Sequence, residues 1–432
     1  MTGYAALRKP FDKPIASGHR DAGTGTISRG ISLSSRRKFV LVSPNISEHM
    51  GGEAIKAYQF LRHLVDGGHD VTVITHSRSA PVLARDFPDV PVFIIEDSPG
   101  QVLTWNIAAL RQFVDVFFFR RVRPILRRII AEHPDAIVHY LCPVSPILPR
   151  FPLPEAINVL GPLTGNIYYP PAFRGEEPLK LKLRRMFHYI AQRTAGVAFG
   201  DKKHFHRILV SGGERTRRSL AWAGVADARM LNVVDSGVSE AIGRFPLIHH
   251  AGDNFKFMTS ARLVTYKGVH LSIEAMKYVE RPITFDIYGD GPIRDSLETF
   301  ADRCGVSDRV RFLGWTDNHA LINAMPQYRG YVAPSLAEAN GIGVQEAMMA
   351  GLPVICLKWG GPVMLADESS AIFIEPDSRE RVVRAIAAAM DALAVDSERA
   401  NSLVHHARAI AERRFGWNEV TEEWQNAYEL VR

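Results

Sequence analysis

Two carboxylates flank a short glycine-containing segment in the last third of the chain, at Glu338 and Glu346. Four of the seven residues between them complete the candidate loop: Asn340, Gly341, Ile342 and Gly343. An apolar strand is expected just before the loop and a helix just after it. Glycines let backbone N–H groups approach a ligand at a helix start, where free amides and the helix dipole favour phosphate. Carboxylates accept hydrogen bonds from hydroxyls, so the pattern suits a ligand with both phosphate and sugar. Ordinary helix-start chemistry is the alternative.

Two cations stand on another loop, Arg262 and Lys267, after an apolar strand that ends near Ser260. Gly268 and a predicted helix follow them. An arginine offers a planar fork of donors and a lysine offers a compact charge, so together they can neutralise a diphosphate. The alternative is a pair of solvated surface cations.

His139 ends a predicted strand, and Gly51 and Gly52 follow the first strand of the chain. The histidine is either functional or a satisfied strand-end residue. A pair of glycines is a weak signal by itself, but its place after the first strand strengthens it.

Composition indicates a soluble globular protein of two domains, because 432 residues exceed one ordinary core. No segment is apolar for long enough to span a bilayer, and the N-terminus has no apolar signal-peptide core. The three cysteines, Cys142, Cys304 and Cys356, lie far apart and form no metal-ligand spacing, which predicts free thiols in a reducing cytoplasm. The net charge of +6 permits contact with nucleic acid or anionic membrane without requiring it.

The order of predicted elements indicates two αβ series. Residues 1–35 are polar and predict a disordered tail. Residues 36–250 form the first domain and residues 251–415 the second, joined near a Pro-, His- and Gly-bearing linker. Strands are predicted at 39–42, 71–75, 92–95, 136–140, 157–160, 196–199, 208–210 and 231–234, and then at 255–258, 283–288, 310–313, 331–333, 353–356 and 371–374. We therefore expect an α/β fold with two Rossmann-like domains facing a central cleft.

Two stretches are both basic and apolar, residues 113–130 and 179–190. Three phenylalanines and several arginines between Phe117 and Arg128 have the composition of a membrane-surface helix. Pro124 is expected to break or bend that helix. Helices with a solvated basic face are the alternative.

The motif between Glu338 and Glu346, with the segment that runs on to Val354, resembles the retaining glycosyltransferases of family 4, which have the GT-B fold. Their R-L-x-x-x-K-G element is similar to the stretch from Arg262 to Gly268. The resemblance implies donor binding by the second domain and acceptor binding by the first. It also implies that a terminal helix, residues 416–432, crosses back to the first domain.

The resemblance implies roles for named residues. Arg262 and Lys267 would stabilise the leaving diphosphate, Glu346 would hold the ribose and Glu338 the donor sugar. Gly51 and Gly52 would approach the donor phosphate, Gly314 would lie near the base, and His139 would reach the reacting sugar. Asn340, Gly341, Ile342 and Gly343 would complete the donor site.

The predicted activity is hexosyl or related glycosyl transfer, with retention, from a nucleotide-diphosphate sugar to a saccharide or lipid-linked acceptor in cell-surface polysaccharide or glycolipid synthesis. No metal and no cofactor is expected. The site would lie in the cytoplasm, and peripheral contact with the inner face of an anionic membrane is a further expectation. Nucleic acid is not the expected partner.

Three other functions are alternatives to this one. A nicotinamide oxidoreductase would need G-x-G-x-x-G after a strand, and Asn45 to Ser47 stand there instead. A nucleotide-sugar epimerase of the same fold and a non-catalytic carbohydrate- or nucleic-acid-binding module remain open. Release of the sugar without an acceptor would identify the epimerase, and salt-sensitive oligonucleotide binding would identify a nucleic-acid-binding module.

Overall fold

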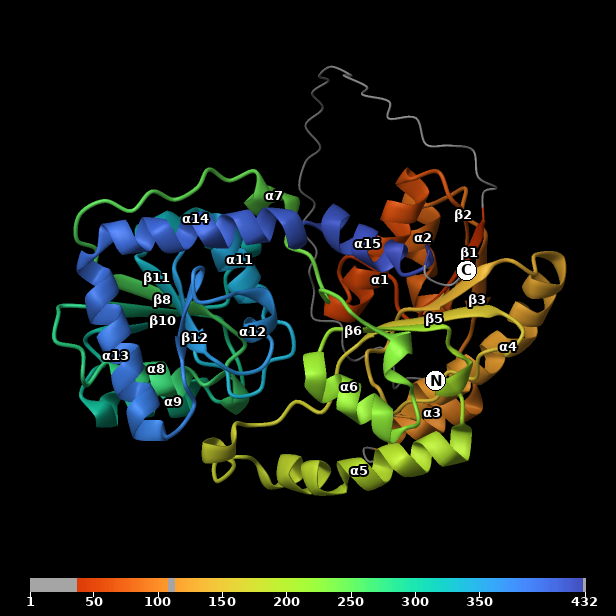
Figure 1. Cartoon of the computed structure of the whole chain (residues 1–432), viewed down its shortest axis with the longest axis horizontal. Helices are drawn as coiled ribbons and strands as arrows, with labels where there is room; N and C mark the ends of the chain where they lie inside the picture. Colours follow the sequence, from red (N-terminus) through yellow and green to blue (C-terminus); the bar gives the residue numbers. More distant parts are fainter. Residues whose placement is uncertain (1–36, 108–112, 430–432) are drawn as a thin grey trace, which may run out of the picture. The chain divides into compact units, whose positions relative to one another are not determined.

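The computed structural model describes residues 37–107 and 113–429. The predicted disordered tail, residues 1–35, lies outside the described residues. Within the described ranges the chain forms two parallel β-sheets with helices around them (Figure 1).

The first sheet has seven parallel strands among the described residues, in the order β3-β2-β1-β4-β5-β6-β7. The strands are β1 Lys38–Val42, β2 Asp70–His76, β3 Val92–Ile95, β4 Ile137–Tyr140, β5 Ile157–Leu163, β6 Arg207–Val210 and β7 Met230–Asn232. The helices of this half are α1 Gly52–Asp66, α2 Ala80–Asp86, α3 Pro99–Asn106, α4 Val114–Glu132, α5 Leu179–Phe199, α6 Gly213–Trp222 and α7 Glu240–Gly243.

The second sheet has six parallel strands in the described part of the chain, in the order β10-β9-β8-β11-β12-β13. The strands are β8 Lys256–Ser260, β9 Thr284–Tyr288, β10 Val310–Gly314, β11 Gly330–Ala333, β12 Val354–Leu357 and β13 Ala371–Ile374. The remaining helices are α8 Val269–Ala275, α9 Arg294–Cys304, α10 Asn318–Ala324, α11 Ile342–Ala350, α12 Pro362–Leu365, α13 Arg379–Val395, α14 Ser397–Arg414 and α15 Trp417–Asn426.

Both faces of each sheet are covered, which explains why the strands are apolar at nearly every position. In β1, Leu41 packs in one core cluster with Phe60 of α1, whereas Val40 packs in another cluster with Phe118 of α4. These apolar runs made the strands readable in the sequence, and all of the predicted strands except one are confirmed. The two Rossmann-like domains expected from the pattern are likewise confirmed.

The exception is the strand predicted at residues 196–199, which was wrong. These residues form the last turn of α5, which ends at Gly200 with a left-handed φ of 55°. Val197 is 83% exposed, so the apolar run is not a buried strand. A short apolar run has no periodicity of its own, and here it continued the helix that precedes it.

Of the break or bend expected at Pro124, the break is absent, because α4 runs without interruption from Val114 to Glu132. Its apolar side is held in the core, where Phe118, Phe119, Val122 and Leu126 are buried. Packing on both sides of the proline therefore compensates for the hydrogen bond that the ring removes.

The last helix packs on the first half of the chain, as the expected GT-B architecture requires. Trp424 of α15 is fully buried, and its indole N–H donates to the carbonyl of Val234 at 2.8 Å. The amide of Val234 in turn donates to Glu423 at 2.9 Å. Figure 1 shows α15 beside α1, away from the sheet that precedes it in the sequence.

Candidate active site

The order of the second sheet reverses between β8 and β11, which are hydrogen-bonded neighbours. Ligands of doubly wound sheets bind beyond the carboxyl ends of the strands at such a reversal. The loop after β8 carries Lys267, and the loop after β11 carries Glu338. The topology therefore brings together two predicted site residues that are 71 positions apart.

The start of α11 is shaped by two glycines with different reasons for being glycine. Gly341 caps the helix with φ at 89°, a left-handed conformation that L side chains rarely adopt. Gly343 has no such φ, but a Cβ there would clash with the hydroxyl of Tyr331. The sequence pattern predicted that these glycines would admit a ligand, and at Gly343 the space is filled by Tyr331.

A second pair of glycines supports the loop that carries Glu338. A Cβ on Gly361 would lie 2.6 Å from the carbonyl oxygens of Ala339 and Asn340, and one on Gly360 would lie 2.7 Å from that of Glu338. The amide of Gly361 donates to the Glu338 carbonyl at 2.9 Å. The loop thus rests directly on this backbone, which fixes the direction in which it enters α11.

Lys267 and Glu338 form an ion pair whose side chains are 23% and 15% exposed. Burial lowers the pKa of Lys267, but the charge and hydrogen bond of Glu338 outweigh it and hold the pKa above its ordinary value. The lysine is thus a firmly charged ammonium. Gly268, with φ at 69°, follows it directly and packs against the carbonyl of Pro334, which ties the two loops together.

Glu346 lies in the second turn of α11 and lines the same pocket as Lys267. Burial raises its pKa from 4.5 to about 7, and a hydrogen bond with Asn318 opposes only part of that rise. A carboxylate without a nearby cation is costly in such surroundings. It is therefore poised to accept hydrogen bonds from hydroxyl groups of a bound molecule.

The pocket has a volume of about 770 Å³ and is lined by residues from both halves of the chain. From the second half come Lys267, Asn318, Glu338, Ala339, Asn340, Gly341, Ile342 and Glu346, with Trp417 of α15. From the first half come residues of α1, namely Gly52, Ile55, Lys56, Gln59 and Arg62, and residues from the segment 235–241 after β7. This size suits a small-molecule ligand.

A second ion pair lines the wall that the first half contributes. Lys56 Nζ lies 2.5 Å from Asp235 Oδ2, and the two side chains are 10% and 7% exposed. The other carboxylate oxygen of Asp235 is buried without a protein hydrogen-bond partner among the described residues. An unpartnered buried acceptor at a pocket wall can receive a hydroxyl or amine of a ligand.

The predicted site residues divide into two groups. The pocket brings together Gly52, Lys267, Glu338, Asn340, Gly341, Ile342 and Glu346. Gly51, His139, Arg262, Gly314 and Gly343 do not line it. Gly51 caps α1 next to Gly52, and Gly314 ends β10 with φ at 77°. Arg262 is exposed on the loop that holds Lys267.

His139 is fully buried, and both of its ring nitrogens are occupied within the protein. One nitrogen is 2.5 Å from the hydroxyl of Tyr428 and the other is 2.8 Å from the carbonyl of Gly161. Burial lowers the pKa of the imidazole from 6.5 to about 3, so it is neutral. This geometry corresponds to the satisfied strand-end histidine, the structural alternative left open by the sequence, and gives the ring no route to the pocket.

Lys56, Asp235 and Asn318 line the pocket without having been predicted from the sequence. Lys56 follows Gly52 by one helical turn, a spacing that places it on the same side of α1. That spacing was a usable signal. Asp235 follows β7 at a strand end, but its pairing with Lys56 spans 179 positions and only the fold reveals it.

No group of three His, Cys, Asp or Glu side chains within residues 37–107 and 113–429 is placed to hold a metal ion. The three cysteines are free thiols. No helix in the described ranges is long and apolar enough to cross a membrane.

Two Rossmann-like parallel sheets, a pocket lined from both, and a terminal helix that returns to the first sheet define the GT-B class of fold. Residues 247–409 match the family model of glycosyl transferases group 1. That match covers the sheet and loops that carry Lys267, Glu338 and Glu346, and it supports a glycosyltransferase.

Relatives and solved structures agree with this class. An uncharacterized glycosyltransferase of Methanocaldococcus jannaschii is 30% identical over 173 residues, which span 39% of this chain and 43% of the relative. The chain thus covers less than half of that relative's length. A human phosphatidylinositol N-acetylglucosaminyltransferase subunit is 24% identical over 426 residues, 96% of this chain and 81% of the relative. Anabaena HepE, solved in complex with UDP and glucose, has a TM-score of 0.58 at 15% identity and covers 91% of this chain and 99% of its own.

Proposed function

We propose that the protein transfers a glycosyl residue from a nucleotide-diphosphate sugar to a saccharide or lipid-linked acceptor, with retention at the anomeric carbon and without a metal ion. The observation that carries the proposal is the group of Lys267, Glu338 and Glu346 in one pocket at the reversal of the second sheet. A cation, a hydroxyl acceptor near it and a second carboxylate match the three parts of such a donor.

Each part of the donor has a partner in this arrangement. The ammonium of Lys267 meets the diphosphate, and Glu346 accepts hydrogen bonds from the ribose hydroxyls. Glu338, in the loop between β11 and α11, accepts hydrogen bonds from hydroxyls of the transferred sugar. Arg262 is exposed on the loop of Lys267 and adds positive charge near the diphosphate without lining the pocket.

The ion pair of Lys267 and Glu338 gives the site a defined resting state. An arriving diphosphate competes with Glu338 for the ammonium. The carboxylate, once released from the lysine, is free to bind the sugar next to the diphosphate. Donor binding therefore exchanges one charged partner for another rather than desolvating an unpaired lysine, which lowers the cost of entry.

The proposed transfer step uses these groups. The bond between the anomeric carbon and the diphosphate oxygen breaks, and a bond to the acceptor hydroxyl oxygen forms on the same face of the sugar. The acceptor's proton passes to the departing diphosphate. Lys267 stabilises the charge that grows on the leaving group, a task for which a fixed cation is effective in a partly buried site.

The acceptor is a saccharide or a lipid-linked molecule that enters from the wall built by α1 and the residues after β7. Asp235 and Lys56 on that wall offer hydrogen bonds to an acceptor. The similarity to a phosphatidylinositol N-acetylglucosaminyltransferase component over most of both chains supports a lipid-linked acceptor. Cell-surface polysaccharide or glycolipid synthesis is the corresponding role, at the cytoplasmic face of a membrane.

A thermal-shift panel of nucleoside diphosphates and nucleotide sugars tests the donor site, since a ligand of the folded state raises its melting temperature. At least one nucleotide sugar is expected to stabilise the wild type. Lys267→Ala should lower the affinity for that ligand about 10- to 100-fold, because a charge-assisted hydrogen bond is lost. Lys277→Ala, which removes an exposed lysine from the same half, is the control. A panel without effect on the wild type, or equal affinity in both variants, would refute the donor assignment.

A further inference from the structure

The long helix α5 exposes apolar side chains along one face. Leu179, Leu183, Met186, Ile190 and Val197 are 72%, 45%, 61%, 54% and 83% exposed. Their spacings of 4, 3, 4 and 7 residues place them in one stripe on a helix. Phe187 and Tyr189 beside the stripe are also about half exposed. Contiguous exposed apolar surface of this kind is unusual in a soluble protein without a partner.

The orientation of α5 is fixed by polar contacts on its opposite face. His188 and Gln192 are buried and both meet the hydroxyl of Ser219 in α6, at 2.8 and 2.6 Å. A Cβ on Gly196 would lie 2.7 Å from the carbonyl of Ala223, so the helix backbone lies directly against the end of α6. The helix thus turns His188 and Gln192 toward the protein together with the smaller Ala195, and exposes its row of large apolar side chains, unlike an ordinary surface helix.

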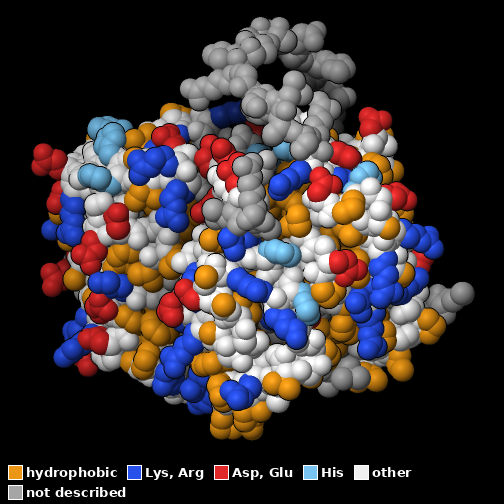
Figure 2. Space-filling view, turned by 45° about the vertical axis from the view of Figure 1, so that its right-hand side comes forward, with side chains coloured by type: hydrophobic (Ala, Val, Ile, Leu, Met, Phe, Trp, Pro, Cys, Tyr) orange, Lys and Arg blue, Asp and Glu red, His pale blue; other side chains and the backbone are white. Residues whose placement is uncertain are grey.

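The charge on α5 has one sign. Five lysines and arginines and no acidic side chain stand between Leu179 and Phe199. Arg185 is engaged by Glu177 at 3.0 Å, which leaves Lys180, Lys182, Arg184 and Arg193 without an acidic partner among the described residues. Figure 2 shows hydrophobic side chains with lysines and arginines near them along the lower edge, where α5 runs in Figure 1.

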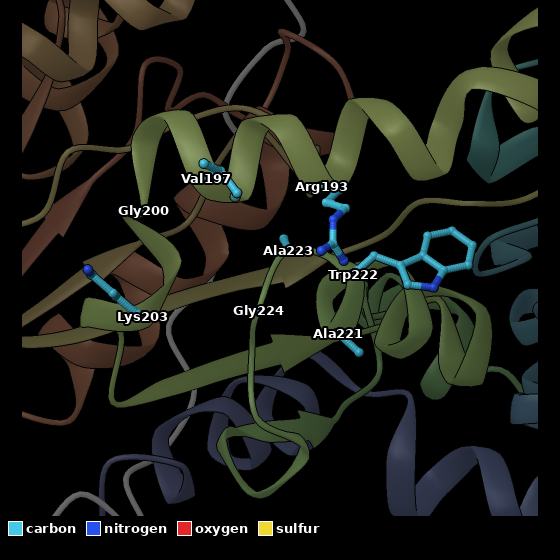
Figure 3. A pocket seen from close by; sticks show the side chains of 9 residues that line it. Arg193, Val197, Gly200, Lys203, Ala221, Trp222, Ala223 and Gly224 are labelled. Atoms are coloured by element: carbon cyan, nitrogen blue, oxygen red, sulfur yellow. The ribbon is translucent and has the colours of Figure 1, made fainter.

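A pocket of about 470 Å³ opens at the carboxyl end of α5. Arg193 and Val197 line it from the helix, Lys203 from the turn that follows, and Trp222 from the end of α6. Figure 3 shows Arg193 reaching from α5 toward Ala223 and Trp222, with Lys203 on the other side of the pocket. Two cations with an indole and an apolar rim suit a phosphate that is attached to an apolar body.

We infer that the exposed face of α5 binds an anionic membrane surface, with its axis in the plane of the interface and the pocket at its end receiving a phosphate-bearing lipid headgroup. The apolar stripe enters the boundary between headgroups and acyl chains, and the flanking cations meet the anionic headgroups, as in interfacial amphipathic helices. The 21 residues of α5 give about 30 Å of contact. This inference does not depend on the transfer chemistry, so its failure leaves the proposed function untouched.

The basic stretch between Phe117 and Arg128 exposes arginines, but it lacks two of the three phenylalanine rings that gave it the composition of a membrane-surface helix. Phe118 and Phe119 are fully buried in the core and have no access to a membrane. These two rings therefore cannot insert into a membrane beside the arginines of α4. The other basic stretch, residues 179–190, forms most of α5.

Co-sedimentation of the full chain with vesicles tests the inference. The wild type should pellet with phosphatidylglycerol–phosphatidylcholine vesicles at low salt, and less at high salt or with phosphatidylcholine alone. Lys180→Glu, Arg184→Glu and Arg193→Glu together should weaken binding about 100-fold, because each basic residue near such a surface contributes about a factor of five. Leu183→Ser, Met186→Ser and Ile190→Ser together should weaken it as well, at unchanged net charge.

Two control triples match the charge change elsewhere. One carries Arg281→Glu, Arg303→Glu and Arg384→Glu in the second half, and the other carries Arg120→Glu, Arg127→Glu and Arg128→Glu on α4. The triple in the second half should keep most of the wild-type binding to anionic vesicles. Circular dichroism and melting temperature verify that every variant is folded.

Three results would overturn the inference. In the first, the wild type fails to pellet with anionic vesicles at low salt. In the second, the α5 triples bind as well as the wild type, or the α4 triple loses more binding than they do. In the third, light scattering without lipid finds a dimer that the serine triple dissociates, which would assign the face to a second copy of the chain.

Discussion

The ion pair between Lys267 and Glu338 is the residue-scale feature on which the proposed donor site depends. The lysine needs a negative partner because the pocket is partly buried, and Glu338 is that partner when no ligand is present. A diphosphate can take over this role without leaving either charge unpaired, provided that the carboxylate finds sugar hydroxyls. Removing one partner alone should therefore lower the stability of the folded protein more than removing both.

Glu346 gives the pocket a pH dependence whose sign can be worked out. Its folded-state pKa is about 7 against 4.5 in the unfolded chain, so the folded state holds the proton more tightly. Stability should then fall as pH rises from about 4.5 to about 7 and level off above. Glu346→Gln cannot ionise and lacks this loss. The difference in melting temperature between variant and wild type should grow in favour of the variant across that range.

Measuring both proteins from about pH 4.5 to about pH 8 checks this, with Glu155→Gln as a control at an exposed turn. A difference that is flat with pH, or that shrinks as pH rises, contradicts the raised pKa. In the same pH range, affinity for the donor should increase as Glu346 ionises, because the carboxylate is the better acceptor for ribose hydroxyls.

Gly343 is predicted to be fixed by Tyr331 and not by the ligand. Gly343→Ala should cost about 1–3 kcal/mol of stability, since the new methyl overlaps the tyrosine hydroxyl. In a Tyr331→Phe background the same change should cost clearly less, because the overlapping oxygen is gone. Urea unfolding of the four proteins of this cycle measures the coupling.

Gly175→Ala, where a Cβ has open space around it, is the control for that cycle. Additive costs for Gly343→Ala and Tyr331→Phe would show that the two residues do not meet. If Gly343→Ala keeps full stability but no longer binds nucleoside diphosphate, the glycine is required by the ligand and not by Tyr331.

At the scale of elements, α15 and the segment after it join the chain's end to the first sheet. Tyr428 contacts His139 of β4 through its hydroxyl, and Phe60 of α1 lies within reach of both rings. Tyr428→Phe leaves His139 with an unpaired buried nitrogen and should cost about 1–3 kcal/mol of stability. Donor binding and turnover of the folded variant should stay near wild type.

Chemical denaturation together with kinetics separates the two roles of His139. Loss of stability with normal turnover supports the structural role that its burial indicates. Normal stability with greatly reduced turnover would mean that the histidine takes part in the reaction, as the family resemblance first implied.

The elements also show how much of the fold could be predicted from the sequence. The strands of both sheets were predictable, because a parallel strand covered on both faces is an apolar run bounded by turns. The run at Gly196–Phe199 has the same composition but continues a helix, and only its exposure distinguishes it. The sequences of α4 and α5 are also similar, because both mix basic and apolar residues. Phe118 and Phe119 of α4 are buried and the aromatic side chains of α5 are exposed, and this difference depends on what each helix packs against.

The loop that is proposed to bind the donor was predictable for a different reason, because Glu338 to Glu346 are contiguous and their chemistry is local. Lys56 and Asp235 could not be paired from the sequence, since each belongs to a separate segment of the first half. The surroundings of His139 could not be predicted either, because a strand-end position says nothing about whether its side chain faces the pocket or the core.

At the scale of the whole molecule, the proposed function assigns donor chemistry to the second sheet and acceptor entry to the first. The pocket is lined from both, and α5 belongs to the half that is proposed to receive the acceptor. If α5 holds the protein at a membrane, a lipid-linked acceptor in that membrane would meet a donor that arrives from solution. The domain boundaries at residues 250 and 415 remain predictions.

The most direct test of the central claim is the acceptor-dependent release of nucleoside diphosphate, with the product examined by NMR. The nucleotide sugar selected by the thermal-shift panel is incubated with the full chain and a membrane lipid or oligosaccharide extract. We expect release that requires the extract, persists in EDTA, falls at least about 10-fold in Lys267→Ala, and yields a product with the donor's anomeric configuration. Release without any acceptor, an inverted product, or undiminished turnover in Lys267→Ala would contradict the proposed function.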